Sequence, residues 1–142
     1  MITHLAVEQG LKVYANDLNP ILQEKAYEFG ALQGDWKEAD IRVIFECTGS
    51  AAATTQLIAD APRGASVILL GLSEKQASFI PLDVVRRGIS IQGSLIYDHP
   101  ADFQSVIQLI EDGKIQPHKI ISKYIPLSEL QAGLESASYG HP

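Results

Sequence analysis

The fold is decided by the stretch "IRVIFECTGSAAATTQLIADAPRGASVILLGL", residues 41–72. It starts with a nearly continuous apolar run over 41–49, rich in β-branched residues, which predicts a strand buried on both faces. Ser50 is a favoured residue at the start of a helix, and it leads into the helical composition of residues 50–60. A Pro/Gly turn then precedes a second buried strand, which ends at Gly71. This succession of strand, helix and strand is the unit from which parallel sheets are built.

The same alternation extends in both directions along the chain. Strands are predicted at 11–17, 41–49, 62–72 and 89–95 and again after His118, and helices within 19–30, 50–60, 80–88, 99–113 and from Leu127 to Leu134. Asn19 as a cap followed by Pro20 is a typical helix start, and Gly30 is a typical stop. We therefore expect an α/β fold with a doubly wound, mostly parallel sheet, in which residues 1–142 form a single domain.

The composition excludes several classes of function. The net charge of −6 disfavours a nucleic-acid partner, which would need a basic face. No apolar run is long enough to span a membrane, and the first ten residues lack the features of a secretory signal. The single cysteine, Cys47, cannot form an internal disulfide or build a structural zinc site alone. We expect a cytoplasmic protein that binds neither nucleic acid nor membrane.

Small or polar residues follow three of the predicted strands. They are Asp17, the Thr48–Gly49 pair and Gly71. In parallel α/β sheets, ligands bind beyond the carboxyl ends of the strands, so these residues are candidates for one site. A carboxylate such as Asp17 can accept hydrogen bonds from ribose hydroxyls and repels a 2′-phosphate, and the glycines would let a ligand approach the backbone. The alternatives are that Asp17 caps the next helix and that the glycines form ordinary turns.

In order and spacing, six segments of the chain resemble the coenzyme-binding half of the medium-chain, zinc-type alcohol dehydrogenases, a family that includes sorbitol and threonine dehydrogenases. The segments are "GLKVYANDLNPILQEKAYEFGA", "IRVIFECTGS", "RGASVILLGL", "ISIQGSLIY", "DFQSVIQLIEDGKI" and "IISKYIPLSELQAGLESAS". The resemblance implies an NAD(H)-binding Rossmann domain. The residues that it implies as cofactor contacts are Asp17, Leu18, Thr48, Gly49, Gly71 and Leu72.

The chain also departs from the family's pattern. "MITHLAVEQG" resembles the helix that follows the family's Gly-rich loop, so we expect the first strand and that phosphate-binding loop to be absent. The catalytic domain with the zinc ligands is expected to be absent too, which leaves no catalytic residue and no zinc in this chain. Leu22 stands where many relatives have a Lys or Arg that contacts the ribose. Binding of NAD is therefore expected to be weakened or lost.

The expected gap has consequences for partners. Without its central strand, the sheet would expose the edges of 11–17 and 41–49, so we expect these two strands to pair directly or to be covered by exchange with another copy. The segment 89–95 resembles the edge strand through which family members form dimers. We expect a homo-oligomer, most simply a dimer.

Three functions remain open from the sequence. The first is an NAD(H)-binding domain of an alcohol or polyol dehydrogenase that is not catalytic alone. The second is a working enzyme whose missing parts are supplied elsewhere. The third is a protein-interaction or nucleotide-binding module that has lost dehydrogenase chemistry.

Overall fold

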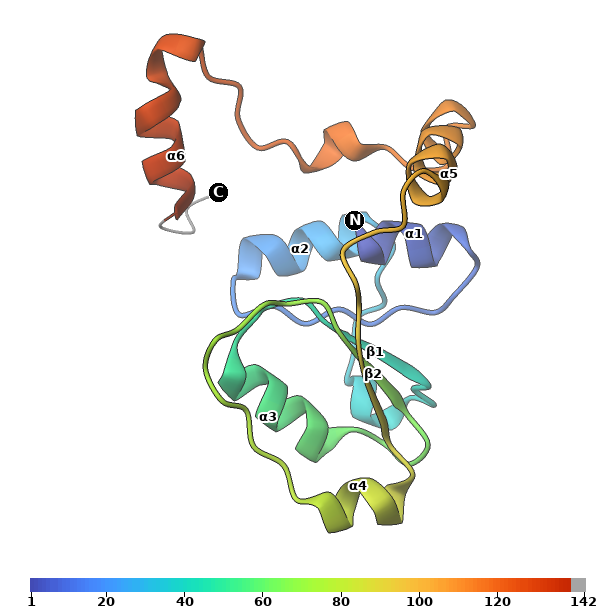
Figure 1. Cartoon of the computed structure of the whole chain (residues 1–142). Helices are drawn as coiled ribbons and strands as arrows, with labels where there is room; N and C mark the ends of the chain where they lie inside the picture. The colour runs from blue at the N-terminus through green and yellow to red at the C-terminus, as the bar shows by residue number, and fades with distance from the viewer. Residues whose placement is uncertain (139–142) are drawn as a thin grey trace. The chain divides into compact units, whose positions relative to one another are not determined.

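The computed structural model describes residues 1–138, which fall into two compact units (Figure 1). One unit combines Met1–Gln33 with His99–Pro142, and the other is Gly34–Asp98. Below, these are called the helical unit and the sheet unit. The expectation of a single domain over 1–142 stays a prediction.

The sheet unit contains a parallel three-stranded sheet in the order β1-β2-β3. Its elements are the short 3-10 helix η1 (Trp36–Glu38), β1 (Val43–Glu46), α3 (Ala51–Asp60), β2 (Ser66–Leu69), α4 (Pro81–Arg87) and β3 (Ser90–Gly93). Ile44 is level with Val67, and Val67 with Ile91, so the three strands run in register. The helices α3 and α4 form the two connections between parallel strands. The predicted α/β class, with a parallel sheet, is confirmed.

The core of the sheet unit is small and apolar. Val67, in the central strand, is completely buried and packs with Ala61 and Ile89. Five partly buried side chains complete this cluster: Ile44, Leu57, Leu69, Val84 and Ile91. Full burial of an aliphatic side chain contributes about 1.5–3 kcal/mol, so this cluster is what holds α3 and α4 against the strands.

A single guanidinium group ties α4 to the end of α3. Arg87 donates from Nη1 to the carbonyls of Ala59 (2.9 Å) and Ala61 (2.8 Å), and from Nη2 to that of Ile58 (3.1 Å). The last carbonyls of a helix have no partner within the helix, and the negative end of its dipole favours a cation. Arg87 thus supplies both hydrogen-bond donors and a positive charge to the carboxyl end of α3.

The prediction of a strand at 11–17 is wrong. Among the described residues this segment contributes only one isolated parallel bridge, between Tyr14 and Leu32. Within the described sheet unit, β1 lies at an edge and pairs with β2. Direct pairing of 11–17 with 41–49, one of the two expected ways to cover the gap, stays a prediction. A strand needs hydrogen-bonded neighbours, and the local sequence cannot supply them.

The helical unit contains α1 (Ile2–Glu8), α2 (Pro20–Glu28), α5 (Ala101–Glu111), η2 (Pro117–Ile120), η3 (Leu127–Glu129) and α6 (Leu130–Ser138). Its best-buried polar side chain is His4, which stacks on Phe29 at 5.2 Å between ring centroids. The Nε2 atom of His4 accepts a hydrogen bond from the backbone N–H of Gln116 at 3.3 Å. The strand predicted after His118 is wrong, because η2 covers residues 117–120 and residues 121–126 form no regular secondary structure.

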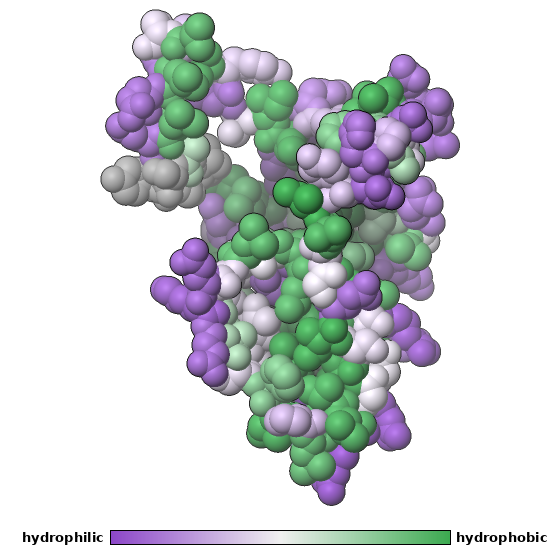
Figure 2. Space-filling model, viewed as in Figure 1, coloured by the Kyte–Doolittle hydropathy of each residue, from purple (hydrophilic) through white to green (hydrophobic). Residues whose placement is uncertain are grey.

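Apolar side chains remain exposed in both units. In the space-filling view they gather on the face of the sheet unit that is turned to the viewer (Figure 2). On β1, Val43 and Phe45 are 49% and 45% exposed. In the helical unit, α5 exposes Phe103, Val106, Ile107 and Ile110. No described helix is both long and apolar enough to cross a membrane.

Candidate functional site

The carboxyl ends of β1 and β2 meet at one edge of the sheet. The main-chain oxygen of Glu46 accepts hydrogen bonds from the N–H groups of both Leu70 and Gly71, each at 2.9 Å. This junction places the Thr48–Gly49 turn, which follows β1, against the Gly71–Leu72 segment, which follows β2. We call the four residues Thr48, Gly49, Gly71 and Leu72 the rim.

The two rim glycines are required by the contact between the segments. A Cβ atom on Gly71 would lie 2.1 Å from the backbone nitrogen of Gly49 and 2.7 Å from its Cα. A Cβ on Gly49 would lie 2.5 Å from the carbonyl oxygen of Leu72, and Gly49 also has a φ of +64°. The sequence suggested that these glycines let a ligand approach the backbone. In the structure the space is occupied by the neighbouring backbone instead, so the glycines serve first to bring the two segments together.

Beneath the rim lies the buried carboxylate of Glu46, which is 2% exposed. Its Oε1 accepts hydrogen bonds from the backbone N–H of Thr48, at 2.7 Å, and from the Thr48 hydroxyl. Its Oε2 accepts a longer hydrogen bond, 3.4 Å, from the N–H of Gly49. The sequence reasoning missed Glu46. The signal was an acidic residue at the end of an apolar strand, two and three residues before Thr48 and Gly49.

The start of α3 continues this hydrogen-bonded network. The backbone N–H of Ser50 donates to the hydroxyl oxygen of Thr48 at 3.0 Å, and the Ser50 side chain accepts from Ala53 as the predicted helix cap. The buried Thr54 hydroxyl donates to the Ser50 carbonyl at 3.0 Å. Thr48 itself is exposed, and Leu72 is 95% exposed. The rim therefore has a fixed base and an accessible surface.

Asp17 belongs to the helical unit and forms a turn before α2. Its Oδ1 accepts a hydrogen bond from the N–H of Asn19 at 2.8 Å, and its own N–H donates to the side chain of Gln23 at 2.7 Å. Asn19 is the cap of α2, as predicted, because its side chain accepts from the N–H of Ile21. Asp17 thus supports the capped turn, and its second oxygen, Oδ2, has no hydrogen-bond donor among the described residues. Asp17 is exposed, and Leu18 is fully exposed.

Cys47 lies between Glu46 and the rim, but it is not activated. Burial of its thiol and the negative charge of Glu46 raise the pKa of Cys47 above its usual value. Cys47 is exposed, and its raised pKa favours the protonated, less reactive form of the thiol. Within residues 1–138, no group of three or more His, Cys, Asp or Glu side chains could hold a metal ion.

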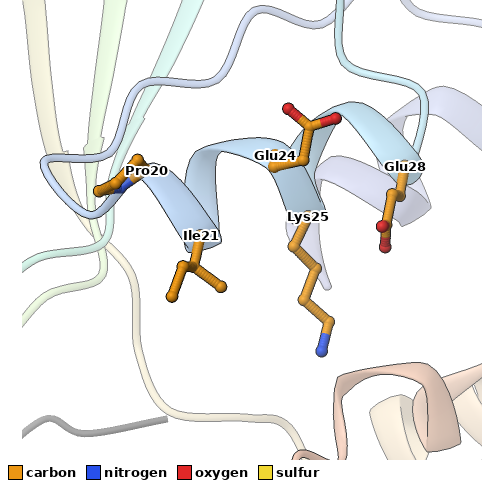
Figure 3. Close-up of a pocket in the computed structure, with 5 residues that line it drawn as sticks. All are labelled: Pro20, Ile21, Glu24, Lys25 and Glu28. Carbon is orange, nitrogen blue, oxygen red and sulfur yellow. The ribbon is translucent and has the colours of Figure 1, made fainter.

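An open hollow of about 500 Å³ lies beside α2, lined by Pro20, Ile21, Glu24, Lys25 and Glu28. Ile21, Lys25 and Glu28 point to the same side of the helix (Figure 3). The lining contains none of the candidate residues, and its mixed apolar and charged side chains define no ligand chemistry. The chemistry of the protein is better sought at the rim.

Comparison with known proteins identifies the relatives of the chain. The model of a family described as zinc-binding dehydrogenases matches residues 1–112. The (R,R)-butanediol dehydrogenase of Bacillus subtilis (strain 168) is 28% identical over 131 residues, covering 83% of this chain and 37% of the relative.

Solved structures of dehydrogenases share the fold of the chain. A short chain alcohol dehydrogenase from E. coli CFT073, complexed with NADH, superposes with a TM-score of 0.85 at 19% identity, covering 96% of this chain and 44% of that one. A structure from Sinorhizobium meliloti 1021, bound to NADP, gives a TM-score of 0.66 at 25% identity, covering 78% of this chain and 37% of that one. The Rossmann-type α/β fold is thereby confirmed. The chain spans between 37% and 44% of the length of these relatives.

Proposed function

Because the chain belongs to the zinc-binding dehydrogenase family, we propose that it is the NAD(H)-binding part of an alcohol or polyol dehydrogenase and is not catalytic alone. The observation that carries the proposal is the junction of the Thr48–Gly49 turn with Gly71 and Leu72. It lies beyond the carboxyl ends of two adjacent parallel strands, where α/β proteins bind nucleotides. When bound, the nicotinamide would supply or accept hydride. The rim residues would orient the cofactor.

Asp17, with the adjoining Leu18, would contact the adenosine ribose. The support is that Asp17 is exposed and that its Oδ2 lacks a donor among the described residues. A carboxylate that accepts hydrogen bonds from the ribose hydroxyls would repel a 2′-phosphate, so the proposed preference is NAD over NADP. The Sinorhizobium relative was solved with NADP, which makes this preference a point to test.

The zinc that the family description implies does not fit the described residues, because they offer no set of ligands for it. We assign no step to a metal in this chain. The proposed contribution of the chain is cofactor binding and orientation. A cytoplasmic location is kept as part of the proposal, because a single cysteine suits a reducing compartment.

A homodimer is proposed as the working form of the chain. Two sheet edges could support it: β3, within the segment 89–95, and β1, which could receive a strand exchanged with another copy. The exposure of Val43 and Phe45 on β1 favours coverage of that edge, because exposed apolar edge strands pair readily. Analytical ultracentrifugation measures this state, and a monomer at 100 micromolar protein would refute the proposal.

The exposed apolar face of α5 supports one alternative. It fits a protein-interaction or nucleotide-binding module that has lost dehydrogenase chemistry. Such a module would bind a partner through apolar contact and need not bind NADH.

Calorimetric titration of the 142-residue chain with NADH and NADPH distinguishes the two functions. The proposal predicts measurable NADH binding, weaker NADPH binding and a loss of about tenfold or more in NADH affinity in Asp17→Ala, as expected for a charged hydrogen bond. Glu28→Ala removes an exposed carboxylate at the other end of α2 and serves as the control. No heat with millimolar NADH would refute cofactor binding and favour the interaction module.

A further inference from the structure

We propose that Glu46 positions the rim and accepts the only hydrogen of the Thr48 hydroxyl. Thr48 can then accept a hydrogen bond from a ligand but cannot donate one. The rim would then select a ligand group that carries a hydrogen-bond donor, such as a ribose hydroxyl or a carboxamide N–H. This inference rests on the proposed function for the identity of the ligand. Its structural part, the hold of Glu46 on the rim, stands on the hydrogen bonds alone.

The first step concerns the burial of Glu46. A carboxylate that is 2% exposed is unfavourable unless donors compensate for its lost hydration. In the described part of the chain no cation pairs with it. Its donors are instead the two N–H groups and the hydroxyl of Thr48 and Gly49. Any rearrangement of the turn would strip the carboxylate of these donors, so Glu46 and the rim conformation depend on each other.

The second step concerns the hydroxyl of Thr48. A threonine hydroxyl has one hydrogen to donate and two lone pairs to accept with. The hydrogen is directed to Glu46, and one lone pair is used by the N–H of Ser50. One lone pair remains on an exposed side chain. Thr48 is therefore an acceptor toward anything that binds at the rim.

The third step is the chemistry of the ligand. A hydroxyl or amide group can donate to the remaining lone pair of Thr48. A phosphate oxygen offers only lone pairs, and the negative charge of Glu46 beneath the rim would disfavour it further. The rim thus suits the sugar or carboxamide portion of a dinucleotide rather than its pyrophosphate.

The hold of Glu46 is tested by hydrogen exchange of backbone amides, measured by NMR on the 142-residue chain. In Glu46→Gln the shape is kept, but the charge and one acceptor are lost. The amides of Thr48 and Gly49 should then exchange about tenfold faster or more, since a hydrogen bond to a charged group is removed. Protection of Val67 in the central strand shows that the variant is folded, and Glu111→Gln is the control for charge alone. Unchanged protection of both rim amides would overturn the proposal.

The acceptor role is tested by NADH titration of Thr48→Val and Thr48→Ser. The valine variant should lose about tenfold in affinity, and the serine variant should restore it. Thr3→Val, which removes a hydroxyl of the same kind from α1 in the helical unit, is the matched control. Equal NADH affinity in the wild type and Thr48→Val would overturn the acceptor role. If the wild type itself does not bind NADH, the proposed function fails and the acceptor role with it, while the exchange result still decides the role of Glu46.

Discussion

Replacement of Arg87 by alanine should destabilise the sheet unit by about 3 kcal/mol. The guanidinium donates to three carbonyls at the end of α3, and two of them belong to the buried residues Ile58 and Ala61. A buried carbonyl left without its donor costs about 1–3 kcal/mol, while the exposed carbonyl of Ala59 can turn to water at little cost. Two such losses give the estimate. Arg87→Lys keeps the charge but not the planar fork, so its cost should fall between those of the wild type and the alanine variant.

Urea denaturation followed by the fluorescence of Trp36 measures this effect. Trp36 is the only tryptophan of the chain and lies in the sheet unit, so its signal reports on the unit that Arg87 stabilises. Arg86→Ala, on the exposed neighbour in α4, should change the free energy of unfolding by about 0.5 kcal/mol or less. A loss below about 0.5 kcal/mol in Arg87→Ala, equal to that control, would refute the claim that Arg87 caps α3.

Three further predictions concern the rim and two titrating groups. Gly71→Ala should lower the free energy of unfolding, measured by urea titration, by about 3 kcal/mol, because the added Cβ would overlap the backbone of Gly49. Gly93→Ala is the control: a Cβ there meets open space, so its cost should be under about 1 kcal/mol. The hydrogen bond from Lys37 lowers the pKa of Asp60, so the stabilisation by Asp60 is complete above about pH 4 and is lost as the pH falls through the lowered pKa. The difference in free energy of unfolding between the wild type and Asp60→Asn should therefore shrink in this acid range. A difference that does not change with pH would contradict the pairing of Asp60 with Lys37. Cys47 is an exposed residue, but partial burial of its thiol and the nearby Glu46 raise its pKa. Its alkylation by iodoacetamide at pH 8 should therefore be slower than in the urea-unfolded chain, and equal rates would contradict the raised pKa.

Local signals predicted the starts of two helices correctly. Asn19 and Ser50 were expected to cap helices, and each does so by accepting a hydrogen bond from a nearby backbone N–H. Such caps involve residues two or three positions apart, so the sequence contains all the information needed. The apolar runs of β1 and β2 correctly predicted strands, but the prediction that the first is buried on both faces is wrong, because Val43 and Phe45 of β1 are 49% and 45% exposed.

The segment 11–17 failed because its composition fits a strand while its neighbours decide the outcome. Tyr14 finds one bridge partner, and the described residues offer no longer pairing. The segment after His118 failed in the same way: its apolar residues follow Pro117, which starts a 3-10 helix. Strand formation depends on non-local pairing that local composition does not encode.

The rim was predicted in position but not in mechanism. Gly49 and Gly71 were expected at one edge of the sheet, and the structure brings them into contact. Their close approach to each other, and the acid beneath them, follow from how two turns fold against one another. Glu46 looked like part of a strand, and only the arrangement of its three donors shows that its carboxylate organises the turn.

The most direct test of the central claim is a titration of the isotope-labelled chain with NADH, followed by backbone amide chemical shifts. The account predicts that the largest changes occur at Thr48, Gly49, Gly71 and Leu72, together with Asp17, and that they saturate with cofactor concentration. Changes that are absent at millimolar NADH, or that occur only at residues other than these, would contradict the account.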